Sequence, residues 1–350
     1  MSHEITSSDG LVLARNGAWH GLGTVLPSAT SVRESFRLAG LGWRVERHPI
    51  YVDRTTILAS GQDPLDAVAE HPRDGAGSAL QVQPDRVALV RSDTVDTFEV
   101  VGKGFEVLQN DELADLIESL SKVGAMQTAD TAGSLRGGRN VFALVPRGEF
   151  DAGSGGRDPV RSYVLFSNAH DGSGSLTIVP TDVRVVCANT LQAATQGIRI
   201  RHTASLKTRI AEAVAALSIA DKRAGEFRAR VRHLAATPMG DEDRRVFFLK
   251  VYERAFGEIP GRPTTATERA KVERATETVG GWLANLESSR NTGTGTEGSV
   301  WHALNAVTEW SDHTRRVRGD DRANRIYSNL LGTSAAFKAG AFALAEAAAG

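Results

Sequence analysis

The stretch from Ser134 to Leu191 indicates the fold more clearly than any other part of the chain. It reads SLRGGRNVFALVPRGEFDAGSGGRDPVRSYVLFSNAHDGSGSLTIVPTDVRVVCANTL. Three runs rich in Val, Leu and Phe, at 140–146, 162–168 and 176–189, predict three strands. The segment HDGSGS between the second and third runs predicts a tight turn, because Asp-Gly and Gly-Ser favour positive φ angles. Short links of this kind join antiparallel neighbours, so the stretch predicts a β-meander.

Helices are predicted on both sides of these strands. Residues 110–121 place Leu113, Leu116, Ile117 and Leu120 on one face, which is typical of an amphipathic helix. From residue 205 onward apolar residues recur every three or four positions, first in a long stripe over 206–235 and then in shorter segments. We therefore expect an α+β fold, an antiparallel β-meander packed on helices, followed by an all-α C-terminal region.

The change of pattern at 205 also suggests how the chain divides. We expect an α+β core over residues 1–204, with a central antiparallel sheet, and a helical region over residues 205–350. The segment NTGTGTEGS at 291–299 predicts a linker within the helical region, and DAGSGGRD at 151–158 predicts a flexible connection between two strands.

Composition limits the class of protein more than it identifies a function. The chain has 350 residues, 41% of them hydrophobic and 24% charged, with a net charge of −1. These values are ordinary for a soluble globular protein. The single cysteine, Cys187, excludes an intrachain disulfide and a cysteine-based zinc cluster, and its apolar neighbours favour a buried thiol. The start of the chain is polar and no run of about 20 apolar residues occurs, so we expect a cytoplasmic protein.

Local charge gives the strongest indication of a ligand. Between Gly133 and Arg209 there are ten Lys or Arg residues and five Asp or Glu residues, within a chain that is nearly neutral overall. In SLRGGRN, two arginines flank a Gly-Gly pair, an arrangement in which guanidinium groups can grip phosphate and glycine allows close approach. The alternative is an ordinary hairpin turn with solvated arginines. Neither a P-loop nor a dinucleotide-binding glycine motif occurs.

Two other groups of polar residues need weighing. His170 and Asp171 could bind a metal or exchange protons, but turn chemistry alone explains the residues of SNAHDGSGS, and no metal-ligand spacing supports a site. In the helix predicted after residue 300, one polar face is formed by Asn305, Glu309, Asp312 and His313, and His302 belongs to the same carboxylate and imidazole cluster. A solvated or salt-bridged face, paired with Arg315 and Arg316, is the simpler interpretation. We expect no catalytic residue, no metal and no cofactor.

Five segments resemble, in order, a family found in phage and plasmid genomes, a domain of unknown function labelled phage/plasmid-like protein. They are AWHGLGTVLPSAT (18–30), FEVLQNDELADLIESL (105–120), SLRGGRNVFAL (134–144), YVLFSNAHDGSGSLTIVPTDVRVVCANTL (163–191) and WHALNAVTEWSDHTRR (301–316). The resemblance implies a mobile-element origin and a bacterial cytosol but no activity. The helix–strand–strand–strand–helix order also resembles phage single-strand annealing proteins, which implies homo-oligomers that hold single-stranded DNA in a basic groove.

From these observations we expect a non-enzymatic nucleic-acid-binding protein of a phage or plasmid, acting on single-stranded DNA in recombination or replication. The predicted phosphate contacts are Arg136, Arg139, Arg184, Arg199, Arg201, Lys207 and Arg209. An aromatic content of 6% offers few rings for base stacking near this stretch.

Two alternatives remain open from the sequence. The first is an oligomeric assembly or host-interaction protein that binds no nucleic acid and uses the helix at 206–235 for self-association. The second is a metal-dependent phosphoesterase that combines His170 and Asp171 with the polar cluster at 302–313.

Overall fold

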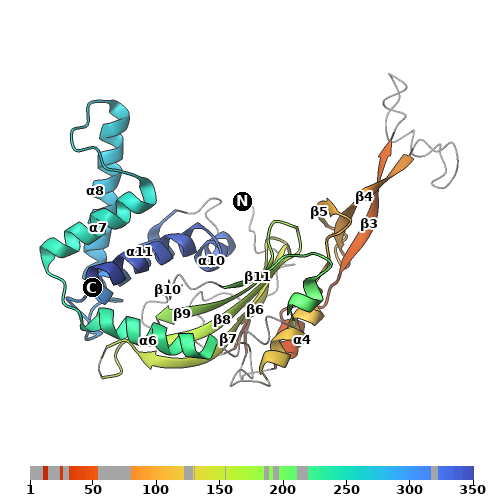
Figure 1. Cartoon of the computed structure of the whole chain (residues 1–350), viewed down its shortest axis with the longest axis horizontal. Helices are drawn as coiled ribbons and strands as arrows, with labels where there is room; N and C mark the ends of the chain where they lie inside the picture. The colour runs from red at the N-terminus through yellow and green to blue at the C-terminus, as the bar shows by residue number, and fades with distance from the viewer. Residues whose placement is uncertain are drawn as a thin grey trace.

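The computed structural model describes residues 11–14, 24–26, 31–53, 80–121, 129, 131–153, 155–184, 189–191, 197–210, 220–316 and 322–350. A curved sheet forms the middle of the molecule, a group of helices lies at one end, and a three-stranded sheet projects from the other end (Figure 1). Cys187, predicted to be a buried thiol, lies outside the described residues, as does the segment 18–23 near the start.

The predicted meander is the centre of the large sheet. Its strands are β6 (Thr131–Leu135), β7 (Asn140–Asp151), β8 (Pro159–Ala169), β9 (Leu176–Arg184) and β10 (Asn189–Leu191), each antiparallel to the next. β11 (Ile198–Ile200) also pairs with β9, while β1 (Leu11–Ala14) pairs antiparallel with β6 and parallel with β2 (Thr24–Leu26). The antiparallel arrangement predicted from the three apolar runs is therefore confirmed.

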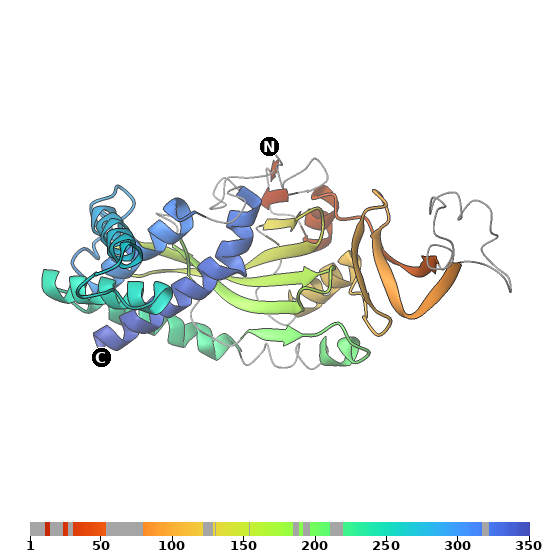
Figure 2. The same ribbon diagram turned by 90° about the horizontal axis from the view of Figure 1, so that it is seen from above.

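Side chains alternate between the two faces of the large sheet along each strand, and helices pack on both faces. On one face Val141, Ala143 and Phe166 pack with α1 (Val32–Leu38) and α4 (Asn110–Ser121). On the other face Phe142 and Leu165 pack with α10 (Arg322–Leu330). Seen from above, α10 and α11 (Thr333–Ala349) cross the sheet diagonally (Figure 2).

The projecting sheet consists of β3 (Val45–Asp53), β4 (Leu80–Arg91) and β5 (Thr97–Gly102), all antiparallel. Arg91 joins it to the large sheet: its guanidinium, almost fully buried, bonds to Asp93 at 2.7 and 3.0 Å and donates to the Gly137 carbonyl at 3.1 Å. Trp43 lies beneath this guanidinium, 4.6 Å from it. The junction is thus made of backbone and side-chain contacts to the glycine pair of SLRGGRN.

The second half of the chain is helical, as predicted, and has its own apolar core. Its described helices are α6 (Ala220–Ala236), α7 (Asp241–Phe256), α8 (Ala266–Leu286), α9 (Val300–Glu309), the π-helical turn η1 (Trp310–Thr314), α10 and α11. The middle of the long helix expected over 206–235 lies outside the described residues, with helix on both sides of it. None of the described helices is long and apolar enough to cross a membrane.

The loop at 291–299 is packed between the sheet and the helices. Thr294 and Thr296 in this loop are buried, and Thr296 donates to the Asp158 carboxylate at 3.3 Å. The same carboxylate accepts a 2.9 Å hydrogen bond from the Trp301 indole at the start of α9. The loop therefore connects two helices, as expected, while holding the β7–β8 hairpin against them. The division into regions at residue 204/205 stays a prediction.

Candidate nucleic-acid interface

The two arginines of SLRGGRN lie in the turn between β6 and β7, where each supports the local structure. Arg136 has a positive φ of 60°, and its guanidinium lies 5.6 Å from the Tyr327 ring of α10. Arg139 donates to the Thr97 carbonyl at 3.3 Å and lies over the Phe98 ring at 5.8 Å. Both side chains are half-buried. These contacts within the protein explain why both arginines are present without any ligand, and their role in phosphate binding stays a prediction.

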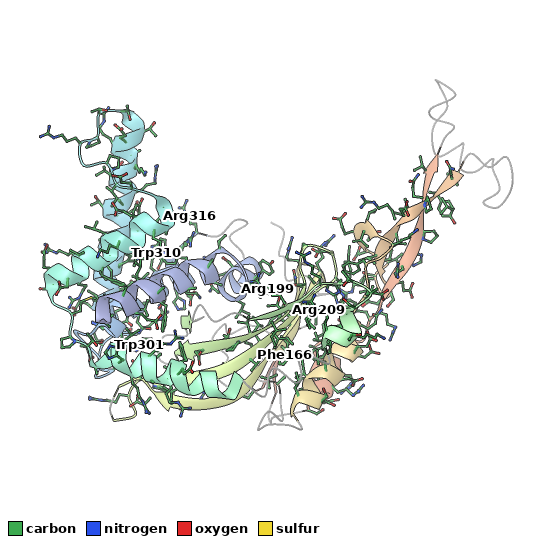
Figure 3. All side chains as sticks on the ribbon, viewed as in Figure 1. Phe166, Arg199, Arg209, Trp301, Trp310 and Arg316 are labelled. Atoms are coloured by element: carbon green, nitrogen blue, oxygen red, sulfur yellow. The ribbon has the colours of Figure 1, made fainter. Side chains whose placement is uncertain are left out.

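The basic residues that follow the third strand are more accessible. Arg199 on β11 is exposed, as are Arg201 and Arg209, and Figure 3 shows Arg199 and Arg209 over the half of the sheet next to α4. Lys207 is exposed but pairs with Glu112 of α4 at 3.2 Å. Arg184 ends β9, and its side chain lies outside the described residues. Arg199, Arg201 and Arg209 are thus exposed on β11 and in the segment that follows it, and we call these three residues the basic edge.

His170 and Asp171 have structural partners rather than catalytic ones. The fully buried His170 ring lies 2.9 Å from the Asn110 amide oxygen and packs edge-on against Trp43 at 5.3 Å. Burial lowers the pKa of His170 to about 3, so the imidazole is neutral at physiological pH. Asp171 closes the predicted turn by accepting hydrogen bonds from the Ser173 backbone at 3.0 Å and hydroxyl at 2.6 Å.

The helix after residue 300 differs from the expected solvated face. Every residue of α9 is buried, and Glu309 accepts hydrogen bonds from Ser288 and Asn291 at 2.9 and 2.7 Å. In η1, the buried Asp312 pairs with the buried Lys338 of α11 at 2.5 Å. The expected pairing with Arg315 and Arg316 is therefore wrong, because these carboxylates face inward. Within the described ranges, no group of three or more His, Cys, Asp or Glu side chains could hold a metal ion.

A further buried carboxyl lies on the large sheet. Asp182 of β9 accepts a 2.6 Å hydrogen bond from the Ser162 hydroxyl of β8. Burial raises the pKa of Asp182 to about 7, although the nearby positive charges of Arg147, Arg228 and Arg230 act in the opposite direction. Because this carboxyl is buried, a ligand cannot reach it, and its raised pKa makes the stability of the fold depend on pH.

The most suggestive surface in the helical half is a cleft of about 890 Å³ between α7, α8 and η1. Tyr252 and Phe256 of α7 form one wall, and Trp310 of η1 forms the floor. Phe256, with 36% of its surface exposed, meets Trp310 edge-on at 6.3 Å, and the buried Trp282 supports Trp310 from behind at 5.7 Å. The cleft therefore presents partly exposed rings held rigid by a buried aromatic cluster.

Positive charge surrounds these rings. Arg274 of α8, Arg315 and Arg316 line the cleft, and Glu277 is the one acidic residue in its lining among the described residues. The Arg315 guanidinium lies 5.5 Å from the Phe256 ring and 5.8 Å from the Trp310 ring. Half-burial among the rings lowers the pKa of Arg315, yet a guanidinium stays charged in proteins. We call this combination the aromatic–arginine cleft (Trp310 and Arg316 are labelled in Figure 3).

Nothing in the local sequence identifies the cleft. Its residues come from three segments between 252 and 316, and each has an ordinary interpretation by itself: a buried aromatic pair, a charged helix face and a basic helix end. The closest signal is WSDHTRR, in which Trp310 precedes Arg315 and Arg316 by about one and a half turns. The first five residues of this segment are π-helical, a form that often marks functional sites.

Comparison with known proteins places the chain in a family without giving it an activity. No curated protein and no solved structure matches it. A family model, described as Domain of unknown function (DUF932), matches residues 97–330. This range is two thirds of the chain and includes the meander, the basic edge and every residue of the aromatic–arginine cleft. The chain therefore belongs to the DUF932 family of domains of unknown function.

Proposed function

We propose that this protein binds single-stranded DNA, and that the aromatic–arginine cleft is its main contact surface. Single-stranded nucleic acid exposes both base faces and phosphates, so its binding sites combine stacking rings with positive charge. The observation that supports the proposal is the presence of Phe256, Trp310, Arg274, Arg315 and Arg316 around one cavity. A volume of about 890 Å³ lies within the range of roughly 300–1,000 Å³ common for ligand sites.

The basic edge supplies a second set of phosphate contacts in this proposal. Arg199, Arg201 and Arg209 are exposed and positively charged, which suits a polyanion held by its backbone alone. The predicted contacts of Arg136, Arg139, Arg184 and Lys207 remain part of the same hypothesis.

The finer parts of the sequence hypothesis also belong here. A phage or plasmid origin, a place in the bacterial cytosol, self-association and a role in recombination or replication by strand annealing would suit a single-strand binder. The role in strand annealing is suggested by the resemblance of the predicted element order to phage annealing proteins, and the antiparallel meander with helices on both faces is compatible with it.

Fluorescence anisotropy with a labelled oligothymidylate at low ionic strength tests the proposal. We expect binding that weakens steeply with salt, because each phosphate contact on a single strand contributes about 0.7 to the slope of log K against log salt. Phe256→Ala removes one stacking ring and is expected to cost about 1–3 kcal/mol of binding, or about 5- to 150-fold in Kd.

Matched variants separate the cleft from general charge. Arg274→Ala is expected to weaken binding, whereas Arg245→Ala removes an equally exposed arginine of α7 that lies outside the cleft and is expected to leave Kd unchanged. Glu277→Gln removes an acidic side chain from the cleft lining and is expected to tighten binding. Absence of oligonucleotide binding by the wild-type protein at low salt, or salt-independent binding, would exclude this function and favour an assembly protein.

A further inference from the structure

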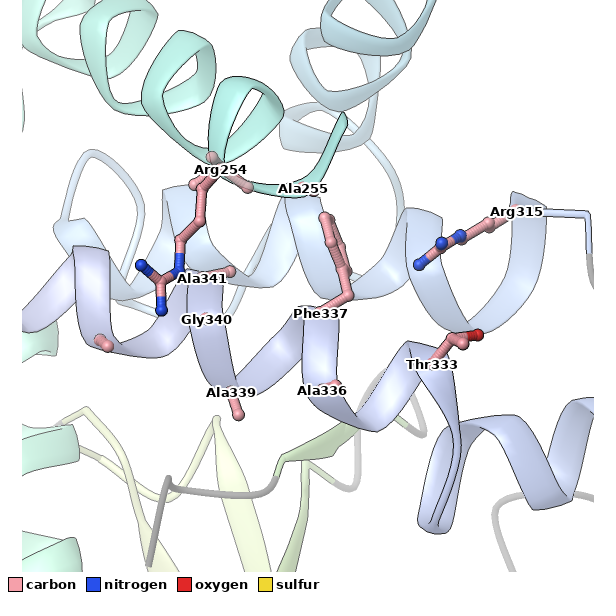
Figure 4. Close-up of a pocket in the computed structure, with 11 residues that line it drawn as sticks. Arg254, Ala255, Arg315, Thr333, Ala336, Phe337, Ala339, Gly340 and Ala341 are labelled. Atoms are coloured by element: carbon pink, nitrogen blue, oxygen red, sulfur yellow. The ribbon is translucent and has the colours of Figure 1, made fainter. Parts of the chain in front are cut away.

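A second cavity, of about 620 Å³, lies between α7 and α11 and adjoins the aromatic–arginine cleft. Two arginines line it, Arg254 and Arg315, and they lie on opposite sides of the Phe337 ring (Figure 4). The Thr333 hydroxyl group is at the same end as Arg315 (Figure 4). The remaining lining is made mostly of alanines and one glycine of α11. The cavity thus has two cations, one hydroxyl and little side-chain bulk.

The glycine in this wall has a specific relation to one of the cations. A Cβ atom on Gly340 would lie 3.0 Å from the Arg254 Nε and 3.5 Å from its Cδ, which is closer than most real contacts. Glycine inside a helix costs about 1 kcal/mol relative to alanine, and α11 otherwise uses alanine freely. Gly340 therefore lets the Arg254 side chain lie flat against α11 beside the cavity.

The two cavities are neighbours through Arg315. This residue lines both of them, and α7 contributes Val251 and Ala255 to one and Tyr252 and Phe256 to the other. The Arg315 guanidinium lies 5.2 Å from Phe337 on the side of the α7–α11 cavity and 5.5 Å from Phe256 on the side of the cleft. A polymer leaving the cleft would pass this guanidinium first.

We propose that the α7–α11 cavity holds the sugar–phosphate backbone of the same strand whose bases stack in the aromatic–arginine cleft. Arg315 and Arg254 contact phosphates there, and Gly340 is a positioning residue for Arg254. Guanidinium groups suit this task because they bind phosphate oxygens bidentately. Phe337 is the only ring among the described residues that line the cavity, so the lining offers little base stacking, and its small side chains allow a backbone to approach closely. This inference rests on the proposed function.

Two variants test the cavity, each with a matched control. Arg254→Ala removes a phosphate contact, and Arg245→Ala is its control on the same helix. Gly340→Ala displaces the Arg254 side chain, and Gly280→Ala is its control, because a Cβ at Gly280 would meet no atom within 4 Å. Alanine favours a helix more than glycine does, so both glycine variants are expected to fold. Circular dichroism and thermal unfolding verify this.

The measurement is anisotropy over a series of oligothymidylates from about 4 to about 16 nucleotides. We expect Arg254→Ala and Gly340→Ala to weaken binding of the longer oligonucleotides and to reduce the salt slope by about 0.7, with little effect on the shortest ones. An oligonucleotide with abasic residues at one end is expected to retain this Arg254-dependent difference, since the cavity reads no bases.

The possible results distinguish this inference from the proposed function. If Phe256→Ala weakens binding while Arg254→Ala and Gly340→Ala match their controls in Kd and salt slope, the backbone path is wrong and the cleft remains. If no oligonucleotide binds to the wild-type protein, both proposals fall together. An Arg254 effect of equal size at every oligonucleotide length also contradicts a path that extends beyond the cleft.

Discussion

Replacing Lys338 by methionine tests whether the buried ion pair with Asp312 holds η1 in place. Both side chains are essentially inaccessible, with 0% and 1% of their surfaces exposed, and their charged atoms lie 2.5 Å apart. Burial lowers the pKa of Lys338 while the adjacent carboxylate opposes that change, so each charge depends on the other. Removing one partner leaves a buried charge without its counterion, which typically costs about 3–5 kcal/mol.

The assay is chemical denaturation followed by circular dichroism, with Lys250→Met as the matched control on an exposed lysine of α7. We expect a loss of about 3–5 kcal/mol for Lys338→Met, below 0.5 kcal/mol for the control, and partial recovery when Asp312→Leu is added, because an apolar pair replaces the ion pair. A loss below about 1 kcal/mol in Lys338→Met, or no recovery in the double variant, would refute the reasoning.

Two further predictions concern pH and packing. His170 has a pKa of about 3 in the folded state, against 6.5 in the unfolded chain, so the unfolded chain takes up a proton at this residue at a higher pH than the folded protein does. As the pH falls below 6.5, the free energy of unfolding therefore decreases by about 1.4 kcal/mol per pH unit. Asp182, with a pKa of about 7, acts oppositely, since stability falls as pH rises from about 4 to 7. Asp182→Asn is therefore expected to unmask the His170 slope in denaturation curves at pH 4 to 7, and an unchanged pH profile would contradict both shifts. Gly138→Ala is expected to destabilise the protein by about 1–3 kcal/mol, because φ is +96° there and a Cβ would lie 3.0 Å from Trp43 and 3.2 Å from Arg91; a melting temperature equal to that of the wild type would show that the junction can adapt.

The sequence predicted the parts of the fold that local patterns determine. The apolar runs, the HDGSGS turn and the helix at 110–121 all have signals within a few residues, and each lies where it was expected. The class of fold follows from their order. The spacing of three and four residues after 205 also predicted helix correctly at 206–210 and in α6, the parts of this stretch that the structure describes, and such spacing is a local property as well.

Burial of polar residues could not be predicted in the same way. Glu309 and Asp312 have the spacing of an exposed helix face, yet both are buried, because the loop that follows α8 supplies a partner for Glu309 and α11 supplies one for Asp312. DAGSGGRD has the composition of a flexible loop, yet Asp151 and Asp158 fix it through backbone hydrogen bonds. These outcomes depend on tertiary contacts, which local composition does not encode.

The candidate site shows the same limit. Charge counting predicted Arg199, Arg201 and Arg209 as contacts, and the structure shows that they are exposed; their role in binding stays a prediction. The same charge count gave equal weight to Arg139, whose guanidinium donates a hydrogen bond to the Thr97 carbonyl and packs over the Phe98 ring. The rings of the cleft were invisible, since they meet only when three separate helical segments pack together.

The bond between Trp301 and Asp158 has a consequence for how the chain is made. Its two residues are 143 positions apart in the sequence, and both are buried when the bond forms. A ribosome releases Asp158 long before Trp301, so in the nascent chain the Asp158 carboxylate at first lacks its indole donor. Closing so large a loop is slow. The β7–β8 hairpin is therefore expected to become resistant to protease only after α9 has been synthesised.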